Sequence, residues 1–132
     1  MPSIYRDFTV KCAPQVAWSA LEDIGAVHTR LAKGFVTETN LEGDVRKVTF
    51  SNGIVATERI LSIDSKHKRI AYCLIDGRVP HHSASFQVFD EGEKTSRIVW
   101  ITDVFPDEAL KSLEPMVDQG VLAIQATLSE SS

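Results

Sequence analysis

Hydrophobic and polar residues alternate along much of the chain with the period of a β-strand. Residues 4–11, IYRDFTVK, place apolar and polar side chains on opposite sides, which predicts a first strand with one buried face. Between residues 35 and 105, short β-rich runs are separated by the turn signals EGD, SNG, DSKHK, DGRVP and DEGEKTS. This part of the chain predicts six further strands, joined mostly as an antiparallel meander.

Two other segments carry a helical period. Residues 13–35 have Pro14 where it suits a first helical turn, and Gly25 and Gly34 interrupt the pattern, so we predict two short helices there. An apolar stripe at helical spacing follows over residues 107–130, which indicates an amphipathic C-terminal helix. Pro115 predicts a short helical turn followed by a longer helix that starts near residue 114.

The order of these elements is strand, two short helices, six strands and a long helix. Such an order is typical of an α+β protein in which an antiparallel sheet covers its apolar face with the last helix. The length of 132 residues and the lack of repeats or linkers predict a single domain over residues 1–132.

The segment GDVRKVTFSNGIVATERILSID, residues 43–64, predicts a β-hairpin with two competing registers. A two-residue loop ending at Gly53 would place Arg46 opposite Arg59, where like charges destabilise the pair. A three-residue SNG loop instead places Arg46 opposite Glu58 and gives Gly53 the left-handed conformation that this loop requires. We therefore predict the register that pairs Arg46 with Glu58.

A few polar residues interrupt the apolar face of the predicted sheet: Arg46, Glu58, Ser62, His82 and Thr102. Burying an ion pair in a solid core gives no gain over apolar side chains, because desolvation costs several kcal/mol per ion. Two interpretations remain open. The pair lies partly solvated at the rim of the sheet, or it lines a cavity between sheet and helix and anchors the polar end of an apolar ligand.

Gly120 lies on the apolar stripe of the last helix. A glycine there costs about 1 kcal/mol of helix stability relative to alanine and removes side-chain volume where the helix faces the sheet. It is consistent with a cavity and equally with a close contact between helix and sheet.

The arrangement as a whole, with APQVAWSALEDIGAV after the first strand, then the hairpin, RIAYCLIDGRVPHHSASFQVF and SRIVWITDVFP before the last helix, resembles the START-like or SRPBCC superfamily. Within it, the chain is similar to the polyketide cyclase/dehydratase and lipid-transport family. The resemblance implies a helix-grip fold, in which a curved seven-stranded antiparallel sheet wraps around a long C-terminal helix above a deep apolar pocket. It also implies binding of lipids, hormones or aromatic polyketides, which some members cyclise or dehydrate.

The predicted function is therefore the binding of a hydrophobic small molecule, and the alternative is a polyketide cyclase/dehydratase-type enzyme. Glu58 and His82 are the candidate catalytic residues for proton transfer. Arg46 would lower the pKa of Glu58 and burial would raise it, and the sequence leaves this balance open. The full set of candidate ligand-binding residues is Arg46, Glu58, Tyr72, His82, Phe86, Trp100, Thr102 and His28.

Composition narrows the range of partners. The net charge is −4 and the basic residues are scattered, which argues against a nucleic-acid partner. No run of 18 apolar residues and no charged-then-apolar leader occurs, so we expect no membrane insertion and a cytoplasmic protein. The histidines and cysteines lack metal-ligand spacing, so we expect no metal and no cofactor. A homodimer is left open.

Overall fold

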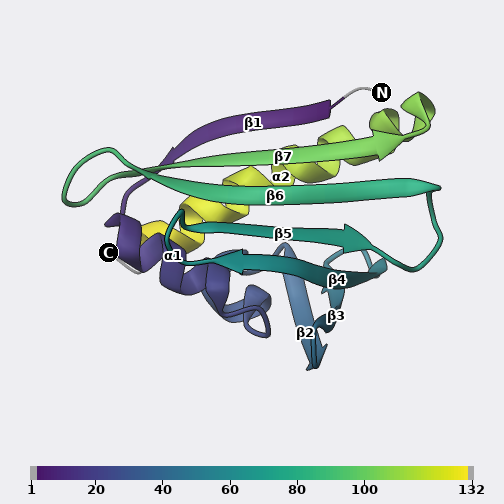
Figure 1. Ribbon diagram of the computed structural model, residues 1–132, viewed down its shortest axis with the longest axis horizontal. Coiled ribbons are helices and arrows are strands. Elements are labelled where there is room, and N and C mark those ends of the chain that lie inside the picture. The colour runs from purple at the N-terminus through teal and green to yellow at the C-terminus, as the bar shows by residue number, and fades with distance from the viewer. Residues whose placement is uncertain (1–2, 131–132) are drawn as a thin grey trace.

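The computed structural model describes residues 3–130. A seven-stranded sheet and two helical regions account for most of them (Figure 1). The elements in chain order are β1 (Ser3–Val10), α1 (Pro14–Glu22), the single π-helical turn η1 (Val27–Leu31), β2 (Val36–Glu42), β3 (Val45–Phe50), β4 (Val55–Asp64), β5 (Arg69–Leu74), β6 (His81–Asp90), β7 (Ser96–Phe105), the 3₁₀ turn η2 (Asp107–Ala109) and α2 (Leu110–Glu130).

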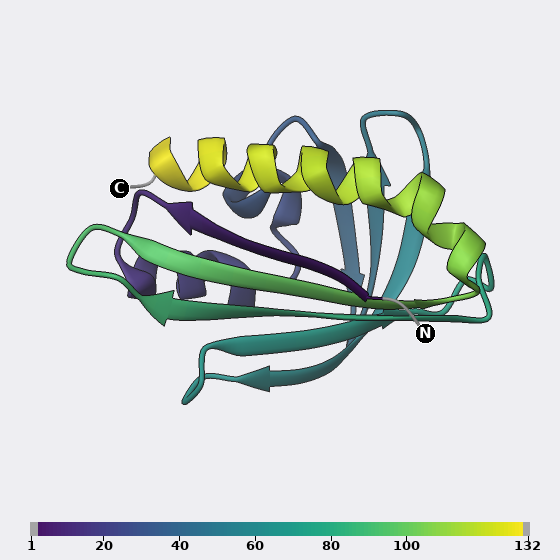
Figure 2. The same ribbon diagram turned by 90° about the horizontal axis from the view of Figure 1, so that it is seen from above.

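The sheet has the strand order β1-β7-β6-β5-β4-β3-β2 and is antiparallel throughout. It curves so strongly that β2 and β3 run across the direction of β6 and β7 (Figure 1). Helix α2 lies along the concave face (Figure 2). These observations confirm the predicted seven-stranded antiparallel sheet around a C-terminal helix, with two short helical segments after the first strand. None of the described helices is long and apolar enough to cross a membrane.

The hairpin of β3 and β4 has the predicted register. Arg46 pairs with Glu58, and the Phe50 amide donates to the Ile54 carbonyl at 2.9 Å across the loop. Gly53 has φ +88°, a left-handed conformation in which a side chain would be strained. The sequence of the loop therefore sets the register, and the register brings the two charged residues together.

A bulge in β4 overturns one face assignment. The register with β5 shifts between Ile60 and Ser62, so that Ile60 pairs with Tyr72 but Ser62 pairs with Ala71. The extra residue reverses the alternation beyond Ile60, and Ser62 is exposed. The expectation that Ser62 lies on the helix-facing side is therefore wrong.

The predicted division of the last helix near residue 114 is also wrong. Helix α2 is continuous from Leu110 to Glu130, with Pro115 inside it. Proline removes the hydrogen bond to the carbonyl four residues earlier, that of Lys111, and crowds that carbonyl. The helix accommodates this loss by bending, and its first turns incline toward the sheet (Figure 2).

The packing of α2 against the sheet changes along its length. In the C-terminal half, Ile124 and Leu128 are 2% and 0% exposed and belong to the main hydrophobic core. In the first turns, residues 110–116 include no buried side chain. The helix and sheet are thus in full contact at one end and separate at the other, where their apolar surfaces enclose a space.

Candidate functional site

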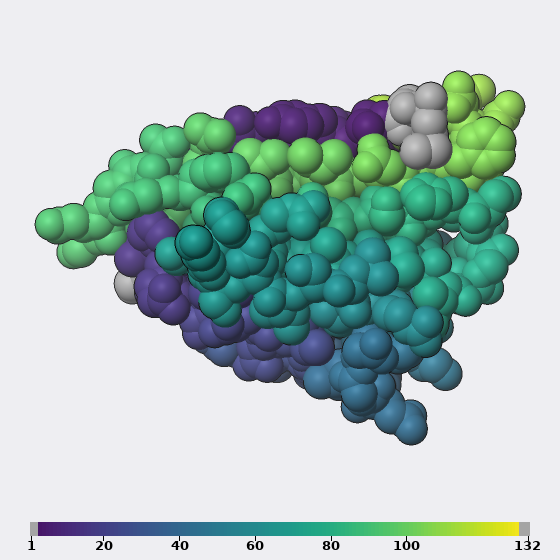
Figure 3. Space-filling view, in the orientation of Figure 1, coloured from purple at the N-terminus to yellow at the C-terminus, as the bar shows by residue number. Residues whose placement is uncertain are grey.

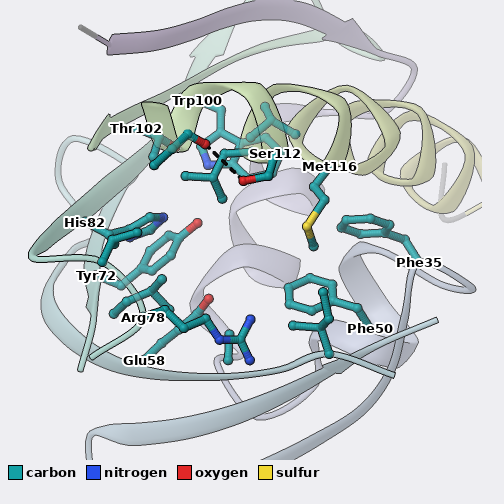
Figure 4. A pocket seen from close by; sticks show the side chains of 17 residues that line it. Phe35, Phe50, Glu58, Tyr72, Arg78, His82, Trp100, Thr102, Ser112 and Met116 are labelled. Carbon is teal, nitrogen blue, oxygen red and sulfur yellow. Dashed lines mark hydrogen bonds between the residues drawn. The ribbon is translucent and has the colours of Figure 1, made fainter. Parts of the chain in front are cut away.

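A cavity of about 320 Å³ lies between the sheet and the first turns of α2. Figure 4 shows Tyr72 and His82 on one side of it and Phe35, Phe50 and Met116 on the opposite side. The strands hide most of α2 when the molecule is seen from the outer face of the sheet (Figure 3). The lining residues are Phe35, Phe50, Ile54, Ala56, Glu58, Tyr72, Leu74, Arg78, Val79, His82, Trp100, Thr102, Ala109, Ser112, Leu113, Met116 and Val117.

A smaller cavity of about 60 Å³ continues the space toward the C-terminal half of α2. Gly120 and Ile124 contribute to it from the helix, and Arg46 and Phe86 from the sheet. Five residues line both cavities: Phe35, Phe50, Glu58, Tyr72 and Trp100. This shared wall consists of four aromatic side chains and one carboxyl group.

The pair of Arg46 and Glu58 lies inside the molecule. Arg46 Nε donates to Glu58 Oε1 at 2.8 Å, and the two side chains are only 6% and 9% exposed. A second guanidinium nitrogen of Arg46 donates to the Ile24 carbonyl at 3.3 Å, and the guanidinium lies over the ring of Tyr72, 5.2 Å from its centroid. These contacts rule out the rim interpretation, because both charged groups are removed from bulk water.

Burial decides the protonation behaviour of Glu58. Desolvation raises the pKa of Glu58 and outweighs the opposite effect of the Arg46 charge and its hydrogen bond, while the charge of Asp76 raises the pKa further. The carboxyl group accepts a proton more readily than a glutamate in water. The raised pKa therefore favours proton exchange between Glu58 and a molecule in the cavity.

Tyr72 and His82 are both shifted toward their neutral forms. Desolvation raises the pKa of Tyr72, and the nearby Glu58 charge adds to this shift. Desolvation is also the main reason that the pKa of His82 is lowered. The Nδ1 atom of His82 is buried without a hydrogen-bond partner in the described part of the chain. This side of the cavity therefore presents neutral polar groups next to the buried ion pair.

Trp100 connects the sheet to the helix. Its ring stacks on Phe86 with the centroids 4.5 Å apart, and its outer edge lies against Gly120. A Cβ atom at Gly120 would come within 2.9 Å of Cζ3 and 3.0 Å of Cη2 of Trp100, and 3.3 Å from Cε2 of Phe35. Gly120 is therefore a position of close contact between helix and sheet.

The structure brings most of the predicted site residues together. Arg46 and Phe86 line the small cavity, His82 and Thr102 the large one, and Glu58, Tyr72 and Trp100 line both. His28 lines neither cavity, although it lies on η1 between Val27 and Leu31, which line the small cavity. Its Nδ1 forms a hydrogen bond with Thr39 Oγ1 at 3.1 Å, away from the cavities.

Sequence reasoning missed the mouth of the cavity. Arg78 and Val79 lie in the loop between β5 and β6, whose sequence DGRVP signals only a turn, and the Arg78 guanidinium donates to the Val55 carbonyl. Met116 was also missed. Its spacing of three residues after Leu113 on the apolar stripe is the signal that could have identified it.

The site is thus a mostly apolar hollow with a few convergent polar groups, an arrangement typical of small-molecule binding. No cluster of three or more metal-ligating side chains occurs within residues 3–130. The carboxyl, imidazole, hydroxyl and guanidinium groups that line the two cavities can supply proton transfer and hydrogen bonding.

Comparison with known families agrees with this geometry. The model of the family described as polyketide cyclase / dehydrase and lipid transport matches residues 1–128. The chain belongs to this family. No curated protein matches the sequence. The comparison with this polyketide cyclase and lipid-transport family therefore rests on the family model and on solved structures.

Several solved structures share the fold at low sequence identity. A START superfamily protein from Mycobacterium smegmatis is 11% identical, with a TM-score of 0.78, and the match covers 98% of this chain and 99% of that chain. The Zhui aromatase/cyclase from Streptomyces sp. R1128 is 17% identical, with a TM-score of 0.77 and coverage of 98% and 92%. Norcoclaurine synthase from Thalictrum flavum, in complex with dopamine and hydroxybenzaldehyde, is 23% identical, with a TM-score of 0.71 and coverage of 98% and 84%.

Proposed function

We propose that this family member binds a hydrophobic small molecule in the cavity between the sheet and the first turns of α2. The observation that carries the proposal is the space of about 320 Å³ where a solid core would otherwise lie. Ligand-binding cavities generally begin at about 300 Å³. Leaving such a volume unfilled forfeits dispersion contacts and hydrophobic burial, and a bound apolar molecule would restore both.

The polar groups would orient the ligand. His82 and Trp100 line the large cavity, and each holds a buried ring nitrogen without a hydrogen-bond partner in the described part of the chain. An unpaired polar group in such surroundings costs free energy. A ligand with a hydroxyl or carbonyl group directed at this side would satisfy these side chains, while its apolar part would contact Phe35, Phe50 and the helix.

Blocking the cavity is expected to remove binding. Ala56 lines the large cavity and is 5% exposed, so Ala56→Leu would place three additional carbon atoms in the space that the ligand needs. We expect calorimetric titration with phenol, 2-naphthol, 1-hydroxypyrene and palmitate to show binding of at least one of these probes to the unaltered protein, and binding at least about tenfold weaker to Ala56→Leu.

Ala71→Leu is the matched control, because it makes the same substitution on β5 at a side chain that lies on the face of the sheet opposite to Tyr72. It should bind the probes as the unaltered protein does. Equal binding by the Ala56→Leu variant, or no binding of any probe to the unaltered protein, would contradict the proposal. Native mass spectrometry of freshly purified protein, with extraction of bound small molecules, gives an independent test.

A cyclase or dehydratase activity is the second candidate, and the raised pKa of Glu58 favours it. In a dehydration of a β-hydroxy ketone, one group removes the α-proton, and the hydroxyl leaves as water after it receives a proton. Glu58 and His82 would exchange these protons, and Arg46 would stabilise negative charge on the ketone oxygen.

This activity can be tested with a β-hydroxy ketone that carries a naphthyl group, by following the absorbance of the conjugated product. If Glu58 and His82 are catalytic, Glu58→Gln and His82→Ala abolish turnover while binding persists. Glu42→Gln and His81→Ala, at exposed positions, are the matched controls and retain it. Because burial lowers the pKa of His82, the acidic limb of the pH profile should lie below pH 6.5, the ordinary value for histidine. If the unaltered protein and every variant bind the ketone without turnover, the proposed enzyme activity is wrong and only the binding function remains.

A cytoplasmic location, a homodimer and the single-domain boundary at residues 1–132 stay predictions from the sequence.

A further inference from the structure

We infer that the ligand is a compact aromatic molecule of about two fused rings, and that Trp100, positioned by Gly120, sets this size limit. The inference rests on the proposed function and makes it more specific. It follows from the size of the cavity, from the residues that end it, and from the side chains that face the ligand.

The volume of the large cavity gives the first limit. An apolar protein cavity of about 150 Å³ holds one benzene molecule. The space here is about 320 Å³, roughly twice as large. On this scale it accommodates two fused rings with a small polar group, whereas a diacyl lipid or four fused rings would extend beyond it.

Trp100 forms the inner end of that space. On the helical side, the small cavity contacts Gly120 and Ile124. The large cavity contacts Ala109 of η2 and four residues of α2: Ser112, Leu113, Met116 and Val117. Trp100 lines both cavities and its ring reaches the helix backbone at Gly120, where a Cβ atom would be only 2.9 Å from Cζ3. Phe35 also lines both cavities and would lie 3.3 Å from the same Cβ atom. The indole and Phe35 therefore separate the two cavities at Gly120, and the indole makes the closer contact.

The small cavity cannot extend the ligand site while Trp100 stays in place. Its volume is about 60 Å³, which is less than half of what one benzene ring occupies and enough for about two water molecules. Two of the residues that line it, Arg46 and Glu58, offer polar partners for water. The hydrophobic part of the ligand is thus confined to the large cavity.

The walls of the large cavity favour a planar ring system. Aromatic side chains approach it from separate elements: Phe50 from β3, Tyr72 from β5, Trp100 from β7 and Phe35 from the segment before β2. Phe35 and Phe50 contact each other with their centroids 5.1 Å apart. Aromatic rings in such surroundings pack in tilted or offset arrangements, so a flat ligand can contact several of them at once.

A series of phenols with increasing ring number tests the size limit. Phenol, 2-naphthol and 1-hydroxypyrene carry the same hydroxyl group on one, two and four rings. We expect calorimetry to show that the unaltered protein binds 2-naphthol more tightly than phenol and does not bind 1-hydroxypyrene or palmitate.

Gly120→Ala tests the role of the glycine. The added methyl group would push the indole of Trp100 into the large cavity, so 2-naphthol should bind about tenfold more weakly, while the binding of phenol stays nearly unchanged. Gly25→Ala is the matched control. Its Cβ atom would meet only the side chain of Leu41, at 3.2 Å. Leu41 lines neither cavity, so we expect no change in the binding of any probe.

A double variant keeps the test independent of folding defects. Phenylalanine lacks the outer ring edge that would collide with a residue 120 side chain, so Gly120→Ala combined with Trp100→Phe should restore the binding of 2-naphthol. Tight binding of 1-hydroxypyrene or palmitate to the unaltered protein, or an effect of Gly120→Ala no larger than that of Gly25→Ala, would overturn the inference while the proposed function stands. If no probe binds the unaltered protein, the proposed function fails and this inference fails with it.

Discussion

Replacing Arg46 with methionine is expected to lower the free energy of unfolding by about 3–5 kcal/mol at neutral pH, because removing one partner of a buried ion pair leaves the other charge uncompensated. Glu58 is 7% exposed, and Arg46 Nε is its hydrogen-bond donor. Methionine keeps the apolar stem of arginine but lacks the guanidinium, so the loss also includes the hydrogen bond to the Ile24 carbonyl and the contact with the Tyr72 ring. The dependence of the loss on pH isolates the effect of the charge. Urea denaturation measures the loss.

The size of this loss should depend on pH. The pKa of Glu58 is raised in the folded protein above its ordinary value of 4.5, and Arg46 acts to lower it. Without Arg46 the pKa in the folded state rises further. A group with a raised pKa stabilises the fold fully below its unfolded pKa, and this contribution disappears as the pH rises through the folded pKa. The difference between the variant and the unaltered protein should therefore be smallest near pH 4.5 and largest above pH 7.

The double variant Arg46→Met with Glu58→Gln provides the control. Glutamine has nearly the same shape as glutamate and carries no charge, so the double variant should recover most of the stability and lose the dependence on pH. If Arg46→Met costs the same at pH 4.5 and pH 7.5, or if the double variant is no more stable than Arg46→Met, the buried charge of Glu58 is not the cause.

The second large effect is expected at the opposite end of α2. Leu128 is 0% exposed in the main core, and Leu128→Ala should lower the free energy of unfolding by about 2–5 kcal/mol, through lost burial and the cavity that remains. The space that this variant creates is distant from residues 109–117, so its affinity for 2-naphthol should stay unchanged under conditions where it is folded.

Leu122 on the same helix is the matched control. It is 67% exposed, and Leu122→Ala should change the free energy of unfolding by no more than about 0.5 kcal/mol. The two variants are compared by thermal and urea denaturation. Equal losses in both would show that the C-terminal half of α2 is not packed against the sheet as the structure indicates.

The sequence predicted the features that local chemistry specifies. The register of the hairpin followed from the SNG loop and from the charges of Arg46 and Glu58, and the order of elements followed from the hydrophobic period. Seven of the eight predicted site residues line a cavity because the alternation in each strand decides which side chains face the helix. The eighth, His28, lies outside any strand, so no alternation fixed its direction.

The features that the sequence did not predict depend on contacts between elements. The bulge that turns Ser62 outward is a property of the pairing between β4 and β5, and the continuity of α2 past Pro115 depends on how the helix bends toward the sheet. The mouth residue Arg78 belongs to a turn, where composition indicates a loop but not its direction. The protonation of Glu58 required the burial of the carboxyl group, which only the assembled fold provides.

The position of β1 at the edge of the sheet has a consequence for how the protein is made. Its only neighbour in the described sheet is β7, and Ile4 pairs with Thr102, whereas each strand from β2 to β6 pairs with the next strand in the chain. During synthesis β1 leaves the ribosome before β7 exists, and it stays without this sheet neighbour until residues 96–105 have emerged. The β1 edge of the sheet therefore cannot form until β7, the last strand of the sheet, has been made.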